Sequence, residues 1–271
     1  MTWDFDGDEW VFFIATAAVA LVGVIRYYRP LISVSSIRMP ILRRGVLACI
    51  PALSIVPTYI VLQRWADAQV VGHLDYIILF MVGAGAWILT ASWFMPVFGI
   101  SVRDDAIERD NPAALIAVSG MLLSVGTVYA LSNIGTGPTI WTTVLPALAA
   151  TILLAAMSML IELLGGQVAE AITIDRDVAT AMRLAGSVLG CAIILGRAAA
   201  GDWVSWKQTW IDLFTHGWPA VLIALAAAVV HRALRPTVTS PKPDIIAFGI
   251  APAAIFVATG VSIAAIASRY L

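Results

Sequence analysis

The chain has 271 residues, of which 61% are hydrophobic and only 12% charged, and its mean hydropathy is +0.92. A soluble domain carries about a quarter charged residues, so this composition excludes a water-soluble protein and places the chain in a membrane. The net charge of −1 excludes the basic surplus that binds nucleic acid, so the lipid bilayer rather than nucleic acid is the expected partner.

Eight apolar stretches, separated by short polar segments, are long enough to form membrane-spanning helices. A helix that crosses the hydrocarbon layer of about 30 Å needs about 20 mostly apolar residues. The expected spans are residues 10–26, 45–63, 77–98, 112–133, 142–164, 178–197, 217–233 and 245–267. The fold class is therefore all-α, a polytopic membrane protein with about eight transmembrane helices. The span 217–233 is the weakest, and a re-entrant segment is the alternative there.

The acidic N-terminus and the distribution of basic residues predict the orientation. Asp4, Asp6, Asp8 and Glu9 precede the first span, and no basic segment does, so that span is not expected to be a signal peptide. With both ends of the chain outside, twelve basic residues fall inside and four outside, as the positive-inside rule requires. The inner set is Arg26, Arg29, Arg38, Arg43, Arg44, Arg103, Arg109, Arg176, Arg183, Arg232, Arg235 and Lys242, and the outer set is Arg64, Arg197, Lys207 and Arg269.

Tryptophans mark the expected outer boundary of the membrane. Amphipathic indole rings favour the interface between lipid and water. The tryptophans at predicted outer ends are Trp3, Trp10, Trp65, Trp141, Trp203, Trp206, Trp210 and Trp218. Residues 204–214 also carry aromatic and aliphatic side chains at helical spacing, which predicts a short interfacial helix in the outer loop.

The sequence repeats itself at an offset of 66 residues. Asn111 then aligns with Asp177, and Gly99 with Gly165. We expect two tandem copies of one helical hairpin, over residues 77–135 and 142–203, in the same orientation because an even number of spans separates their starts. The predicted domains are an N-terminal hairpin at 1–76, a duplicated domain at 77–203, and an outer interfacial segment with a C-terminal hairpin at 204–271.

The two copies resemble a known family. The segments are RDNPAALIAVSG at Arg109–Gly120 and DRDVATAMRLAG at Asp175–Gly186, followed by RAAAGDW at Arg197–Trp203. They resemble the YjfL-like bacterial membrane proteins, the domain of unknown function 350, over about residues 77–203. The resemblance implies a multi-pass protein of the bacterial cytoplasmic (inner) membrane without an established reaction. It also implies an envelope-stress membrane partner of the phage-shock kind.

Asn111 and Asp177 stand where inner turns enter helices. Asn and Asp are preferred N-caps because their side-chain oxygen accepts a free backbone N–H, and Pro112 suits the first helical position. Capping is the structural interpretation. The functional alternative is a pair of oxygens at the inner mouth of a pore.

Small residues one helical turn apart predict close helix packing. Gly120 with Ser124, and Gly186 with Gly190, each place two small residues on one helix face. These faces pack either within the chain or between subunits of a homo-oligomer, and the sequence leaves that choice open.

Glu162 and Arg183 are the most informative charges within the spans. Arg183 lies about 9 Å into the membrane at 1.5 Å per residue from Asp177, and Glu162 lies near the inner end of the preceding span. The structural interpretation is that they pair across the hairpin or that Arg183 extends to the nearby inner surface, and the alternative is that they line a pathway for protons or ions. Arg197 and Trp203 are expected to be an outer interfacial anchor beside Asp202.

No group of residues typical of a reactive centre emerges. His73, His216 and His231 lack further ligands at metal spacing, no Ser-His-Asp or phosphate-binding glycine motif is present, and both cysteines lie in apolar runs. We therefore expect no enzyme, no metal and no cofactor. The leading hypothesis is a non-enzymatic inner-membrane protein that acts through helix-mediated assembly, and the alternative is a channel or transporter for an ion or small solute.

Overall fold

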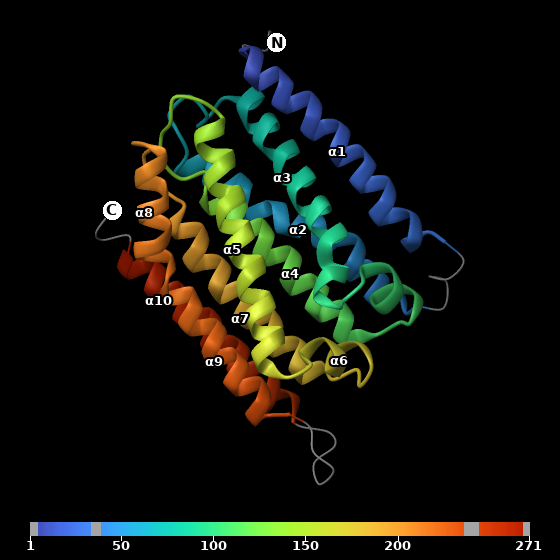
Figure 1. Ribbon diagram of the computed structural model, residues 1–271. Coiled ribbons are helices and arrows are strands. Elements are labelled where there is room, and N and C mark those ends of the chain that lie inside the picture. Colours follow the sequence, from blue (N-terminus) through green and yellow to red (C-terminus); the bar gives the residue numbers. More distant parts are fainter. Residues whose placement is uncertain (1–4, 34–38, 236–243, 268–271) are drawn as a thin grey trace.

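The computed structural model describes residues 5–33, 39–235 and 244–267 (Figure 1). These residues are helical and contain no strand, and eight helical segments are long and apolar enough to cross a membrane. The predicted all-α class and the presence of eight helical segments able to span a membrane are confirmed. Trp3, Arg38, Lys242 and Arg269 lie outside the described residues.

The helices follow the predicted spans closely, with short additional turns between them. The α-helices are α1 Gly7–Leu31, α2 Ile41–Arg64, α3 Leu74–Phe94, α4 Pro112–Leu131, α5 Trp141–Gly165, α6 Val168–Thr173, α7 Val178–Ala198, α8 Trp206–Gly217, α9 Pro219–Ala233 and α10 Ala251–Ala267. The tighter or wider turns are the 3-10 helix η2 Met95–Phe98 and the π-helices η3 Val102–Glu108 and η4 Ile246–Ile250.

The spans form two layers, each ordered as in the sequence. Figure 1 shows α1, α3, α5 and α9 in front of α2, α4, α7 and α10, and in the second layer each helix packs on the next. The central helices are the most enclosed. Of the most apolar stretch of each helix, 67% of the residues are buried in α4 and 72% in α7, against 17% in α1 and 11% in the span that contains α10. Helices α1 and α10 are therefore the exposed edges of the two layers.

Small residues allow the second layer to pack closely. A Cβ atom added to Gly120 would lie 2.3 Å from the Ala185 Cβ atom, and one added to Gly126 would lie 2.2 Å from the Ser54 carbonyl oxygen. Neither distance leaves room for a side chain, because ordinary contacts begin at 3.4 Å. The backbones of α2, α4 and α7 approach one another only because these positions are glycine.

The seventh span differs from the prediction. Helix α9 has 15 residues, about 22 Å at 1.5 Å per residue, which is shorter than the hydrocarbon layer. Helix α8 precedes it directly, and the apolar segment Trp206–Ala233 has 28 residues. The predicted helix at 204–214 thus exists, with different bounds, and continues into the segment predicted as a separate span.

The chain enters and leaves the bundle at the same end, because α1 begins and α10 ends there (Figure 1). We call this the outer end and the opposite one the inner end, after the orientation that the sequence predicts. The turns η3, α6 and η4 lie at the inner end, next to the starts of α4, α7 and α10.

Candidate functional site

Arg183 is completely buried, with 0% of its side chain exposed. Its Nη2 atom donates a hydrogen bond to Thr180 Oγ1 at 2.6 Å and lies 4.0 Å from Asp177 Oδ2, and its Nη1 atom donates to the carbonyl oxygen of Phe248. Phe248 belongs to the π-helix η4 that leads into α10. The guanidinium therefore ties the start of α7 to the start of α10.

Glu162 has a local partner instead of Arg183. Its Oε2 atom accepts a hydrogen bond from the Ala169 backbone N–H at 2.8 Å, which holds the beginning of α6 against the end of α5. The described residues contain no ion pair between Glu162 and Arg183, and the carboxylate nearest to Arg183 is that of Asp177. The predicted pair is thus corrected, because the turn at Gly166 and Gln167 returns the chain to Glu162.

Asn111 and Asp177 both cap the helices that follow them. Asn111 Oδ1 accepts from the backbone N–H groups of Ala113 and Ala114, and Asp177 Oδ1 accepts from Ala179 N–H at 3.0 Å. Asn111 is buried and also donates through Nδ2 to the Ile172 carbonyl oxygen at 2.8 Å. Its polar atoms are thereby used inside the protein and do not line an open pore mouth.

The predicted packing faces are used within the chain. Gly120 meets Ala185 of α7, and Ser124 is buried and returns its hydroxyl to the Gly120 carbonyl oxygen at 2.7 Å. An added Cβ atom on Gly186 would lie 2.5 Å from the Ala253 Cα atom, and one on Gly190 would lie 2.6 Å from the Phe256 carbonyl oxygen. Of the two arrangements that the sequence left open, the structure shows the intramolecular one.

Arg197 and Trp203 are near the outer end but do not share Asp202. The Asp202 Oδ1 atom accepts from the backbone N–H and the hydroxyl of Thr136, at 2.9 and 2.8 Å. Arg197 is half-buried and makes no ion pair with any described residue. Trp203 packs edge-on against Trp206, with 5.8 Å between the ring centroids. The anchor is aromatic, and Asp202 instead joins two outer loops.

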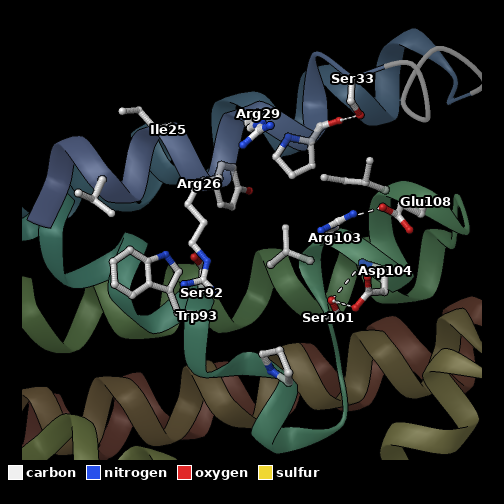
Figure 2. Close-up of a pocket in the computed structure, with 16 residues that line it drawn as sticks. Ile25, Arg26, Arg29, Ser33, Ser92, Trp93, Ser101, Arg103, Asp104 and Glu108 are labelled. Carbon is white, nitrogen blue, oxygen red and sulfur yellow. Dashed lines mark hydrogen bonds and ion pairs between the residues drawn. The ribbon is translucent and has the colours of Figure 1, made fainter.

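A cleft of about 970 Å³, lined by both charged and apolar side chains, opens at the inner end between α1, α3 and η3. We call it the inner cleft. Figure 2 shows Arg26 and Arg29 extending from α1, Ser92 and Trp93 at the end of α3, and Arg103 on η3. Its full lining is Val22, Ile25, Arg26, Tyr27, Arg29, Pro30, Ser33, Ser92, Trp93, Pro96, Ser101, Val102, Arg103, Asp104, Ile107 and Glu108.

The charges of the inner cleft are unevenly matched. Arg103 donates to Glu108 at 2.8 Å, which raises the pKa of the guanidinium, and Asp104 accepts from the Ser101 hydroxyl at 2.9 Å (Figure 2). The Arg26 guanidinium lies over the Trp93 ring, 5.1 Å from its centroid. Neither Arg26 nor Arg29 has a described carboxylate within ion-pair distance. Three arginines against two carboxylates leave the lining with a net positive charge.

The sequence predicts that these arginines lie on the inner side of the membrane, but it does not predict that they line one cleft. Arg26 and Arg29 are three residues apart on one helix, which places them on neighbouring positions of one face. Arg103 comes from a π-helix 74 residues further along the chain, so its position depends on how α1 packs on α3. The spacing of Arg26 and Arg29 was the only local signal.

A second hollow, of about 610 Å³, is almost entirely apolar and lies between α1, α3, η2 and α5, from mid-depth toward the inner end. We call it the apolar groove. Trp87 of α3 crosses it and donates through Nε1 to Thr151 Oγ1 of α5 at 3.1 Å. Its lining includes Ala15 and Val19 of α1, Phe94 of α3, Val97 of η2 and Ala155 of α5.

Among the described residues, no three His, Cys, Asp or Glu side chains lie together in a way that could hold a metal ion. Comparison with protein-family models, with curated proteins and with solved structures finds no match. The resemblance of residues 77–203 to the YjfL-like proteins therefore stays a prediction from the sequence.

Proposed function

We propose that this membrane protein acts without catalysis, by binding an anionic group in the inner cleft. The proposal depends on the pair Arg26 and Arg29. Both line the inner cleft, and neither has a carboxylate partner among the described residues. Guanidinium groups bind phosphate and carboxylate through two parallel hydrogen bonds, and such charge-assisted bonds are about twice as strong as neutral ones. The Trp93 ring packs against the Arg26 guanidinium and restricts it before an anion binds, so less conformational entropy is lost on binding.

The test is thermal unfolding of the purified protein in neutral detergent with phosphate or glycerol phosphate added. A ligand that binds only the folded state stabilises it by about 2.7 kcal/mol at a hundred times its Kd. We expect stabilisation of the wild type and its loss in the double variant Arg26→Gln/Arg29→Gln. Arg44→Gln, at the same end but outside the cleft lining, is the matched control. Equal stabilisation of the wild type and the double variant would refute the proposal.

We propose, further, that the chain is built from repeated hairpins with both ends outside the bacterial inner membrane. Matching backbone features 66 residues apart support the repeat. Asp110 and Arg176 both have positive φ, and so do Gly135 and Gly201. Asn111 and Asp177, which follow Asp110 and Arg176, each donate the backbone N–H to the carbonyl oxygen six residues earlier.

The assembly role stays part of the proposal in a narrower form. Since the small-residue faces of α4 and α7 are used within the chain, a homo-oligomer or an envelope-stress partner would have to contact the edge helices, of which α1 and α10 are the least buried. Native mass spectrometry of the purified protein tests for the oligomer.

A channel or carrier is the competing proposal, and it has lost its supporting pair. Arg183 is held by Asp177, Thr180 and a backbone carbonyl, which is the environment of a structural anchor. Flux of protons, potassium, sodium and chloride through reconstituted liposomes, with Glu162→Gln and Arg183→Met in parallel, tests it. We expect no flux above that of empty liposomes, and flux that these substitutions change would favour the conduit.

A further inference from the structure

We infer that the ligand of the inner cleft is an anionic phospholipid, with its phosphate on Arg26 and Arg29 and an acyl chain along α1 in the apolar groove. This inference rests on the proposed anion binding and names the source of the anion. It commits to a lipid of the surrounding bilayer rather than to a phosphate that arrives from water.

The surroundings of Arg26 favour an amphiphile. Arg26 lies within the apolar segment Gly7–Leu31, about 7.5 Å before its inner end at 1.5 Å per residue. Its neighbours Val22 and Ile25 also line the cleft, and both are exposed on a helix that is only 17% buried. In a bilayer these side chains touch lipid, so the anion that reaches Arg26 from that side carries an apolar part.

One face of α1 connects the two hollows. Ala15 and Val19 line the apolar groove, and Val22, Arg26 and Arg29 line the inner cleft. Their spacing of four, three, four and three residues places all five on one side of the helix. Since Val19 and Val22 are less than one turn apart, the groove begins where the cleft ends along this face.

Polarity along this face matches a phospholipid. Charged groups lie at the inner end and almost purely apolar residues at mid-depth, over about 16 Å from Arg26 to Ala15. A lipid of the inner leaflet has the same order, headgroup at the surface and chain toward the centre. Basic hollows between transmembrane helices on the cytoplasmic side bind anionic headgroups for this reason. A free phosphate would use only the cleft and would leave the groove without a role.

The experiment separates headgroup from chain. Kd values are measured by native mass spectrometry on the full chain in neutral detergent, with dioleoyl phosphatidylglycerol, glycerol phosphate and dioleoylglycerol as probes. The variants are Arg26→Gln/Arg29→Gln for the cleft and Ala155→Phe for the groove. Ala156→Phe is the matched control, because Ala156 is the exposed neighbour of Ala155 on α5 and does not line the groove.

We expect phosphatidylglycerol to bind the wild type at least tenfold more tightly than either partial probe. The double variant Arg26→Gln/Arg29→Gln should weaken it by about a hundredfold, since each lost charge-assisted hydrogen bond contributes about tenfold. Ala155→Phe should weaken it by at least about fourfold, the loss expected when one methylene group of the acyl chain is excluded from the groove. Ala155→Phe should leave glycerol phosphate unchanged, and Ala156→Phe should leave both probes unchanged.

Two results would overturn the inference. One refutes only the lipid assignment, and the other also refutes the anion site of the proposed function. If glycerol phosphate binds as tightly as phosphatidylglycerol and Ala155→Phe does not change either Kd, the lipid assignment is wrong while the anion site stands. If the double arginine variant binds both probes as the wild type does, the anion site itself is wrong.

Discussion

The contact between α7 and α10 depends on glycines at its closest points, and Gly186 gives the sharpest test of the fold. In Gly186→Ala the new Cβ atom would lie 2.5 Å from the Ala253 Cα atom, 2.6 Å from its Cβ atom and 2.7 Å from its carbonyl oxygen. These are backbone atoms or the first side-chain atom, so no flexible side chain can move aside. Relief to the ordinary limit of 3.4 Å requires the two helices to separate by about 0.9 Å.

The magnitude follows from two opposing terms. Overpacking that shifts the backbone costs about 1–3 kcal/mol. Replacing glycine by alanine in a helix returns about 0.8–1.0 kcal/mol through backbone entropy. We expect Gly186→Ala to lower the free energy of unfolding by up to about 2 kcal/mol relative to the wild type, and to be less stable than a glycine-to-alanine variant without overpacking by about 1–3 kcal/mol. Gly120→Ala, whose Cβ atom would lie 2.3 Å from the Ala185 Cβ atom, should behave alike.

Gly85→Ala provides the control, because its added Cβ atom would meet only the Ile55 Cδ1 atom, at 3.9 Å. It should keep the helix-propensity gain and lose nothing, so its free energy of unfolding should equal or exceed that of the wild type by up to about 1 kcal/mol. The assay is reversible unfolding in mixed micelles with increasing dodecyl sulfate, followed by circular dichroism. A Gly186→Ala protein as stable as Gly85→Ala would show that α7 and α10 do not pack as described.

Three further predictions use the same protein. Asn111→Asp keeps the capping oxygen but loses the N–H donor to the Ile172 carbonyl, so the free energy of unfolding should fall by about 2 kcal/mol, and unchanged stability would contradict the buried bond. Arg183→Met removes the donor that holds the start of α10, and amide hydrogen exchange there should accelerate at least tenfold while exchange in α4 stays the same. In a cysteine-free background, Lys207→Cys should react with an impermeant maleimide in intact cells and Glu108→Cys only after lysis, and the reverse pattern would invert the proposed orientation.

Features that depend on neighbouring residues could be predicted from the sequence. The capping roles of Asn111 and Asp177 needed only the residue type and the helix that follows, and the structure confirms both hydrogen-bond patterns. The number of spans likewise follows from apolar length, and the starts of α4 at Pro112 and α7 at Val178 are as predicted. Local preference and hydrophobic length are sufficient for these features because neither requires knowledge of packing.

Features that depend on the path of short connections could not be predicted. The sequence predicts a pair between Glu162 and Arg183 because both lie near the inner end. In the structure, the turn through Gln167, which has φ of +63°, starts α6 and brings the Ala169 N–H to Glu162 instead. The same limit applies to the inner cleft, since Arg103 is placed by η3 after the turn at Gly99. Turns with positive φ set the direction of these segments, and apolar periodicity says nothing about them.

The inner cleft lies beside the edge helix α1, which contacts with α3 and α2 fix on both sides of Arg26. Gly23 of α1 lets the helix approach Leu89 of α3, where an added Cβ atom would lie 2.7 Å from the Leu89 Cβ atom. Nearer the inner end, the Tyr27 hydroxyl donates to the Leu47 carbonyl oxygen at 3.0 Å and so ties α1 to α2. Between these two points the other side of α1 remains uncovered, and η3 closes the hollow from below. Because α1 is fixed at Gly23 and at Tyr27, on either side of Arg26, the guanidinium is held in position before an anion binds. Less conformational entropy is therefore lost on binding.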